Sequence, residues 1–161
     1  MSNLFGDNLS GAEFSTCRNY RYALWRIWDM NKPKVMFIGF NPSTANEISD
    51  DPTIRRVKSI AHNLDFGGVY MANLFAWVTP YPDELLKCTD PIKGNDLWLK
   101  KIASLCAEII FAWGSFKEAQ EQAMKVIMMF PEAKALVINK DGSPRHPLYV
   151  PGNISPVKYK P

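Results

Sequence analysis

The sequence predicts an α/β fold of three layers, in which helices cover both faces of a central, mainly parallel sheet of four strands. Four short apolar runs each end at a turn signal, which is typical of buried strands. Segments with helical apolar spacing separate these runs, and such alternation implies right-handed crossovers between parallel strands. The predicted strands are Val35–Phe40, Val69–Asn73, Ile109–Trp113 and Ala135–Ile138.

Before the first of these strands the chain divides into two parts. Residues 1–16 are mostly polar with several Gly and Asn, and we expect a loose lead-in. Residues 17–28 carry aromatic and Arg side chains in partial alternation. This pattern favours an edge strand, with a short helix as the alternative.

Three helices are predicted between the strands. The pair Asp51-Pro52 opens the first, which runs from about 54 to 64. Asn95 caps the second, which reaches about residue 107, and Ser115 caps the third, which reaches about residue 130.

The remaining segments are expected to be irregular. Prolines make 78–93 a loop with at most a short helical turn, residues 141–149 form a long loop after the fourth strand, and residues 150–161 form a C-terminal tail. With 161 residues, the chain is most simply one domain spanning 1–161.

Composition narrows the classes of function. The net charge of +3 permits contact with nucleic acid or a phosphorylated ligand without requiring either. The three cysteines Cys17, Cys88 and Cys106 are widely separated and the chain has two His, so no metal site and no cofactor are predicted. A reduced, cytoplasmic setting without membrane contact follows from the cysteine usage and the lack of a long apolar run. The oligomeric state stays open.

Polar side chains follow the predicted strands at the point where each ends. Asn41, Ser43 and Thr44 follow the first strand, Asn73 ends the second, and the loop with His146 follows the fourth. Because the carboxyl ends of parallel strands meet at one edge of a sheet, we expect Asn41, Asn73 and His146 to line one pocket there. Asn presents both a donor and an acceptor, which suits a base edge.

Several of the candidate site residues also have a simpler interpretation. Each Asn could cap its own turn. His146 could be an inert loop residue, and Arg56 could pair with an acidic residue. Trp77 could simply pack against neighbouring side chains without contacting a ligand.

Six segments carry distinctive motifs in one order: Tyr20-Arg21-Tyr22, Asn41-Pro42-Ser43-Thr44-Ala45, Asp51-Pro52-Thr53-Ile54-Arg55-Arg56, Asn73-Leu74-Phe75-Ala76, Ala112-Trp113-Gly114 and the segment 141–149. Over about residues 17–150, this set of motifs resembles the DUF1643 family. A more distant likeness is to the uracil-DNA glycosylase superfamily, in particular its mismatch-specific branch. Gly39-Phe40-Asn41-Pro42 looks like the water-activating loop of that branch, and His146-Pro147 looks like its His-Pro-Ser loop.

The chain also departs from that pattern. Ser43 stands where the first loop has Gly, Leu148 stands where the second has Ser, and the acidic residue of the most active glycosylases is missing from the first loop.

The distant resemblance implies recognition of a pyrimidine in DNA or in a nucleotide, with hydrolysis of the N-glycosidic bond as the reaction. Asn41 would orient water, His146 would stabilise the departing base, Asn73 would read the base edge, and Trp77 or Phe40 would stack on it. The candidate residues are catalytic Asn41 and His146, and substrate-binding Gly39, Phe40, Pro42, Ser43, Thr44, Asp51, Thr53, Arg56, Asn73, Trp77 and Arg145.

Two other functions remain open at this point. The pocket could hold a nucleotide or modified nucleoside without cleaving it, which the low charge favours. The protein could also be a different transferase or hydrolase acting on modified bases, in conflict between phage and host.

Overall fold

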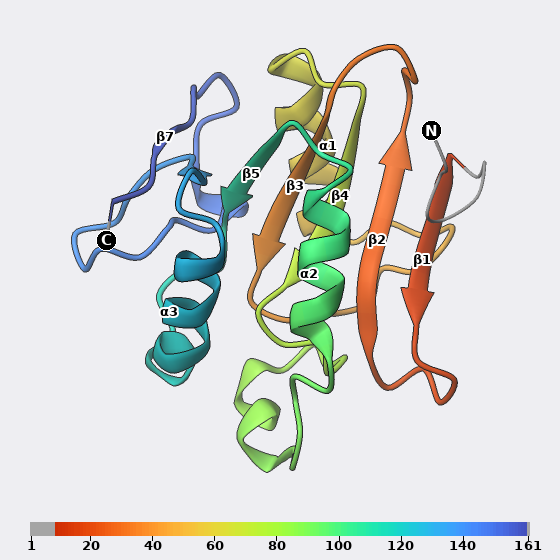
Figure 1. The fold of residues 1–161 in the computed structure, drawn as a ribbon, viewed down its shortest axis with the longest axis vertical. Helices are drawn as coiled ribbons and strands as arrows, with labels where there is room; N and C mark the ends of the chain where they lie inside the picture. Colours follow the sequence, from red (N-terminus) through yellow and green to blue (C-terminus); the bar gives the residue numbers. More distant parts are fainter. Residues whose placement is uncertain (1–8, 161) are drawn as a thin grey trace.

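The computed structural model describes residues 9–160, which form an α/β fold with three α-helices and a seven-stranded mixed sheet (Figure 1). The strands lie in the order β1-β2-β4-β3-β5-β6-β7. Their bounds are Ser10–Phe14 (β1), Arg21–Ile27 (β2), Lys34–Gly39 (β3), Gly68–Asn73 (β4), Glu108–Phe111 (β5), Lys134–Ala135 (β6) and Val157–Lys158 (β7). The helices are α1 (Pro52–Asn63), α2 (Asn95–Ala103) and α3 (Gln120–Met129), with short 3-10 turns η1 (Pro82–Lys87), η2 (Lys117–Ala119) and η3 (Pro147–Tyr149).

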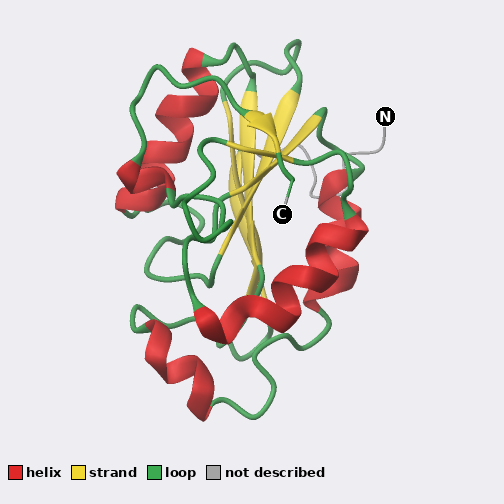
Figure 2. Ribbon diagram, turned by 90° about the vertical axis from the view of Figure 1, so that its left-hand side faces the viewer, coloured by secondary structure: helices red, strands yellow, loops and turns green. Residues whose placement is uncertain are grey.

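Strand β3 lies at the centre of the sheet because nearly every residue in it is apolar and can be buried on either face. It pairs in parallel with β4 on one side and with β5 on the other. Met36 and Ile38 belong to the apolar cluster that includes α2 and α3, whereas Val35 and Phe37 belong to the cluster that includes α1. Figure 2 views the sheet nearly edge-on, with helices on both sides of it.

Helix α1 follows from its sequence as expected. Asp51 is the N-cap, and its carboxylate accepts a hydrogen bond from the Ile54 amide at 2.9 Å. Pro52 occupies the first turn, where its missing N–H leaves no bond unmade. The buried face of the helix consists of Ile54, Val57, Ile60 and Ala61.

The starts of the other two helices differ from the prediction. Gly94, with a φ of 78°, is the N-cap of α2, and the Asn95 side chain instead donates to the backbone oxygens of Asn73 and Leu74. Helix α3 begins at Gln120 after a 3-10 turn, and Ser115 pairs with Ser143 rather than with the helix. Both polar side chains find stronger partners in neighbouring segments than at a helix end.

The predicted sheet of four strands is too small, because both chain ends contribute strands. The lead-in of 1–16 contains β1, which pairs antiparallel with β2, so β2 is an interior strand rather than an edge. Residues 1–8 of that lead-in lie outside the described part. Gly11 permits the pairing, because a Cβ there would lie 2.4 Å from Trp25 Cζ2. The tail of 150–161 contains β7, which pairs antiparallel with β6.

The fourth predicted strand is shorter than expected. Strand β6 covers only Lys134–Ala135, and Ile138 then forms an isolated bridge with Pro144. The backbone turns between these two residues, where the Asn139 amide donates to the Ser143 carbonyl at 2.8 Å. This turn brings the loop with His146 back toward the sheet.

No helix within residues 9–160 is both long enough and apolar enough to cross a membrane.

Candidate functional site

A cavity of about 160 Å³ lies at the carboxyl ends of β3 and β4, and we call it the Asn41 cavity. Residues from β2, β3, β4, the start of α1 and four loops surround it. Its lining residues are Arg21, Gly39, Phe40, Asn41, Ser43, Asp51, Thr53, Ile54, Met71, Asn73, Thr79, Pro80, Pro82, Phe116 and His146. Eight of the sequence-predicted site residues are therefore brought together here.

Asn73 is buried on the α1 side of the sheet, with 3% of its surface exposed. Its register partner on β3 is Gly39, and a Cβ on Gly39 would lie 2.8 Å from Asn73 Oδ1. The glycine thus leaves the room that the Asn73 amide occupies. Asn73 Nδ2 is buried and has no hydrogen-bond partner within residues 9–160.

Asn41 joins two loops. Its Nδ2 donates to the carbonyls of Thr79 at 2.8 Å, Pro42 at 3.0 Å and Trp77 at 3.4 Å. These bonds orient the side chain, and no residue in 9–160 donates to its Oδ1. The amide oxygen is the group that Asn41 can offer to a water or a ligand.

His146 lies at the start of η3 and is partly buried. Its Nδ1 accepts from the Leu148 amide at 3.2 Å, so the proton of the neutral ring resides on Nε2. Burial lowers the pKa of His146, and the negative charge of Asp51 opposes that shift only in part. At neutral pH the ring is therefore uncharged and has an Nε2–H to donate.

Arg21 and Asp51 supply the charges of the cavity. Arg21 is 3% exposed, and its Nη1 donates to the Ala45 carbonyl at 3.0 Å. Desolvation lowers the pKa of Arg21 to about 10, while the nearby Asp51 carboxylate opposes this shift. The guanidinium remains charged at neutral pH, in a setting where water cannot screen it.

Five predicted residues do not line the Asn41 cavity. Thr44 is exposed, and the Pro42 carbonyl accepts from the Thr79 amide at 3.0 Å. Trp77 packs edge-on against Tyr20, with ring centroids 5.3 Å apart. Arg145 donates to Asn139 Oδ1 at 2.7 Å. Arg56 does not line the Asn41 cavity. It donates instead to the backbone oxygens of Pro147 and Val150 and so holds η3.

Several lining residues were not expected from the sequence. Arg21 belongs to a segment that was predicted as an edge strand and was not assigned to the site. Thr79, Pro80 and Pro82 come from a loop whose path has no sequence signal. Phe116 stacks on Phe40 with a centroid distance of 4.0 Å and an interplanar angle of 7°, so an aromatic side chain already covers one side of Phe40.

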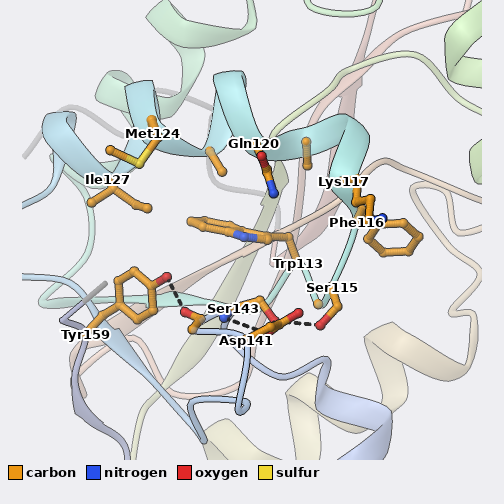
Figure 3. A pocket seen from close by; sticks show the side chains of 14 residues that line it. Trp113, Ser115, Phe116, Lys117, Gln120, Met124, Ile127, Asp141, Ser143 and Tyr159 are labelled. Carbon is orange, nitrogen blue, oxygen red and sulfur yellow. Dashed lines mark hydrogen bonds between the residues drawn. The ribbon is translucent and has the colours of Figure 1, made fainter.

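A second, larger cavity of about 540 Å³ lies beside the first, and Figure 3 shows it from close by. We call it the Trp113 cavity, since the Trp113 ring lies between α3 and the loop 141–143. Several of its polar groups pair with one another: Ser115 Oγ lies 2.6 Å from Ser143 Oγ, which donates to Asp141 Oδ1 at 2.5 Å. Tyr159 donates to the Gly142 carbonyl at 2.7 Å. Such satisfied groups have less to gain from a ligand than the unpaired donors of the Asn41 cavity.

A groove of about 660 Å³ borders both cavities, and we call it the Tyr149 groove. It shares Pro80, Pro82, Phe116 and His146 with the Asn41 cavity. Leu148 and Tyr149 line it and are 45% and 75% exposed. A ligand larger than the Asn41 cavity can therefore extend along this groove.

Within residues 9–160, no group of three or more His, Cys, Asp or Glu side chains could hold a metal ion.

The chain belongs to the family described as Protein of unknown function (DUF1643), whose family model matches residues 21–148. The matched segment spans the strands, loops and helix that form the Asn41 cavity. No curated protein and no solved structure matches the chain.

Proposed function

We propose that this protein binds a pyrimidine base in the Asn41 cavity and hydrolyses the N-glycosidic bond that joins the base to its sugar in DNA. The observation that carries the proposal is that Asn41, Asn73 and His146 line one cavity of about 160 Å³. A cavity of about 150 Å³ holds a benzene ring, so the space suits a single six-membered ring.

The polar groups of the cavity suit the steps of this reaction. Water attacks the anomeric carbon of the sugar, the carbon–nitrogen bond breaks, and its electron pair stays on the base. Asn41 Oδ1 can accept a hydrogen bond from the water, and the Nε2–H of His146 can donate one to the base anion. The attacking water releases one proton to solvent while its hydroxyl remains on the sugar, and the departing base takes up one proton from solvent.

The Tyr149 groove supports an extended substrate. A base in duplex DNA must leave the stack to reach such a cavity, at a free-energy cost of a few kcal/mol. The exposed Leu148 and Tyr149 beside His146 offer apolar surface to the neighbouring nucleotides. We further propose a three-layer, uracil-DNA-glycosylase-like arrangement around a parallel core; the parallel pairings of β3 with β4 and β5 support it.

A second candidate function is binding of a nucleotide or modified nucleoside without cleavage. One observation favours it: Asn41 Nδ2 donates to three backbone carbonyls, which is a structural role sufficient by itself to explain this residue. An amide also cannot take a proton from water as a carboxylate can, so a hydrolase of this kind is expected to be slow.

Strand breakage distinguishes the two functions. The protein is incubated with single-stranded and duplex DNA containing uracil or modified pyrimidines, and alkali then converts abasic sites to breaks. The proposal predicts breaks at the modified position, lost in Asn41→Ala and reduced in His146→Ala, with Arg55→Met as a surface control. No breaks on any substrate, together with micromolar binding of a free nucleotide, would establish the binding function instead.

A further inference from the structure

Among the polar residues of the Asn41 cavity, Arg21, Asn73 and Thr79 are the most buried, and the side chains of the first two have hydrogen-bond donors without an acceptor. Arg21 Nε and Asn73 Nδ2 are buried and have no partner within residues 9–160. Both side chains are 3% exposed, and both residues line the cavity. A buried donor without an acceptor destabilises the folded state by about 1–3 kcal/mol, and more when it is charged.

Arg21 differs sharply from Arg26, the other buried arginine of β2. Arg26 forms an ion pair with Asp50 at 2.9 Å and donates to the carbonyls of Trp25 and Asn46 at 2.8 and 2.6 Å. The Arg21 side chain has one hydrogen bond, to the Ala45 carbonyl, and forms no ion pair with any residue in 9–160. The protein supplies acceptors for the Arg26 guanidinium, whereas it leaves Arg21 Nε without one.

Asp51 provides the negative charge near Arg21, but its carboxylate already accepts a hydrogen bond from another group. Asp51 lines the same cavity, but it uses Oδ1 to cap α1 by accepting from the Ile54 amide. Its charge offsets that of Arg21 without forming a direct contact with it. The cavity therefore still offers a positive charge and two donors to a small molecule that enters it.

We propose that the base bound in the Asn41 cavity is an acidic pyrimidine, which presents an ionised oxygen, on the ring or in a carboxyl substituent, to Arg21 and a second oxygen to Asn73. The inference rests on the proposed function, because it assigns the substrate class of the same cavity. The volume restricts the ligand to one ring, and the two unpaired donors select acceptor oxygens over amino groups. A hydrogen bond between ionised partners is about twice as strong as a neutral one, so the ionised oxygen gives most of the preference.

Titration calorimetry with three single-ring probes tests the proposal on the full chain at neutral pH. The probes are barbiturate, uracil and cytosine. Barbiturate is an anion with a third exocyclic oxygen, uracil is neutral, and cytosine carries an amino group. We expect barbiturate to bind at least tenfold more tightly than uracil, and cytosine to bind most weakly. Equal affinity for barbiturate and uracil, or no binding of any ring, would overturn the proposal.

Two variants assign the preference to residues. Arg21→Met is expected to remove the preference for barbiturate over uracil, whereas Arg55→Met, on the exposed surface of α1, should retain it. Because a buried substitution can unfold the chain, Asn73→Asp provides an independent change of the same shape, and its carboxylate should also weaken barbiturate binding at least tenfold. Thermal melting of each variant shows whether it is folded. A folded Arg21→Met that keeps the full preference contradicts the assignment.

The source of the ring is distinguished by a second pair of probes. The first is 5-carboxyuracil as a free base, and the second is the same base within a single-stranded oligonucleotide, each compared with its uncarboxylated counterpart. Carboxylate-dependent binding in either form supports the proposal and identifies the source, and its loss in both contradicts it. Strand breaks at plain uracil without any preference for anions would leave the proposed function intact and refute only this inference.

Discussion

Gly39 is the residue on which the position of Asn73 most directly depends. In Gly39→Ala the new Cβ would lie 2.7 Å from Met71 Cε and 2.8 Å from Asn73 Oδ1, so the Asn73 amide must move. We expect a loss of about 1–3 kcal/mol in the free energy of unfolding, as for other overpacked sites. Urea denaturation measures this loss, and calorimetry should show that ring binding disappears.

Gly11→Ala is the matched control for this substitution. Gly11 lies on β1, on the far side of β2 from β4. The new Cβ in Gly11→Ala would meet the Trp25 ring, so this variant should lose stability as well. Because Gly11 does not line the Asn41 cavity, its variant should retain ring binding once folded. Ring binding by Gly39→Ala equal to that of the native protein would show that Asn73 is not fixed in this way.

The stability of the protein should depend on the ionisation of His146. Burial lowers the pKa of His146 below its ordinary value of about 6.5, so the unfolded chain binds this proton more readily than the folded chain. The contribution is fully present above pH 6.5 and is lost as the pH falls through the lowered pKa. Urea denaturation between pH 7.5 and about 5 should therefore show a smaller decrease in stability for His146→Gln than for the native chain.

His62→Gln controls for histidine replacement in general, because His62 is exposed on α1. The same urea measurements on His62→Gln report the effect of replacing a histidine that does not line the Asn41 cavity. If His146→Gln shows the same decrease as the native chain, the neutral, buried state assigned to His146 is wrong.

At the scale of single residues, the sequence predicted the cavity residues that follow strands, open α1 or begin the His-Pro loop, but not Arg21, Phe116 or the loop 79–82. Asn41 and Asn73 follow apolar runs, and a parallel sheet brings such positions together. Arg21 could not be found in this way, because its burial depends on β1 covering β2 and on the Ala45 carbonyl. Trp77 was assigned by its place after a strand, yet its ring turns toward Tyr20.

Among the elements, the turn η3 depends on a single side chain of α1. Arg56 donates to the carbonyls of Pro147 and Val150, and so fixes the segment that begins at His146. In Arg56→Met both bonds are lost, and hydrogen bonds from charged groups contribute about 1.5–3 kcal/mol each. We expect faster hydrogen exchange at the amides of Tyr149 and Val150, which bond within η3.

Arg55→Met is the neighbouring control, since Arg55 is exposed and donates only to the Asp50 carbonyl at 3.1 Å. Hydrogen exchange at the η3 amides should be unchanged in Arg55→Met. Equal protection in the two variants would mean that η3 is held by its own turn rather than by α1.

The elements that the sequence failed to predict are short strands without an apolar run. Strand β1 contains Gly11 and Glu13, and β7 contains only two residues, both exposed. Backbone pairing with a longer neighbour holds such strands, and this pairing leaves little trace in side-chain pattern. Helix α1 was predicted well because its cap, its proline and its apolar stripe all agree.

For the whole molecule, the α/β class followed from apolar runs alternating with helical patterns, and it is confirmed. The size of the sheet and its mixed direction were not foreseeable, since they depend on the two chain ends returning to the sheet edges. The shape of the Asn41 cavity likewise depends on four loops whose paths are set by contacts distant in sequence, such as that of Asn41 with Thr79.

Binding of DNA should weaken as salt is added, although only modestly. The chain carries a net charge of +3, and each phosphate that it neutralises contributes about −0.7 to the slope of affinity against salt for single strands on logarithmic scales. Fluorescence anisotropy with a uracil-containing oligonucleotide should give a shallow negative slope. A slope of zero would argue that the ligand is a free base without phosphate.

The central claim is that a pyrimidine base enters the Asn41 cavity, and a crystal structure of a complex tests it most directly. The ligand is a single-stranded oligonucleotide with 2′-fluoro-deoxyuridine, whose fluorine slows cleavage of the glycosidic bond. The account predicts the base between Asn73 and His146, with an oxygen within hydrogen-bond distance of Asn73 Nδ2 and the sugar at Asn41 Oδ1. A base bound instead in the Trp113 cavity, or stacked on Tyr149 with the Asn41 cavity unfilled, would contradict it.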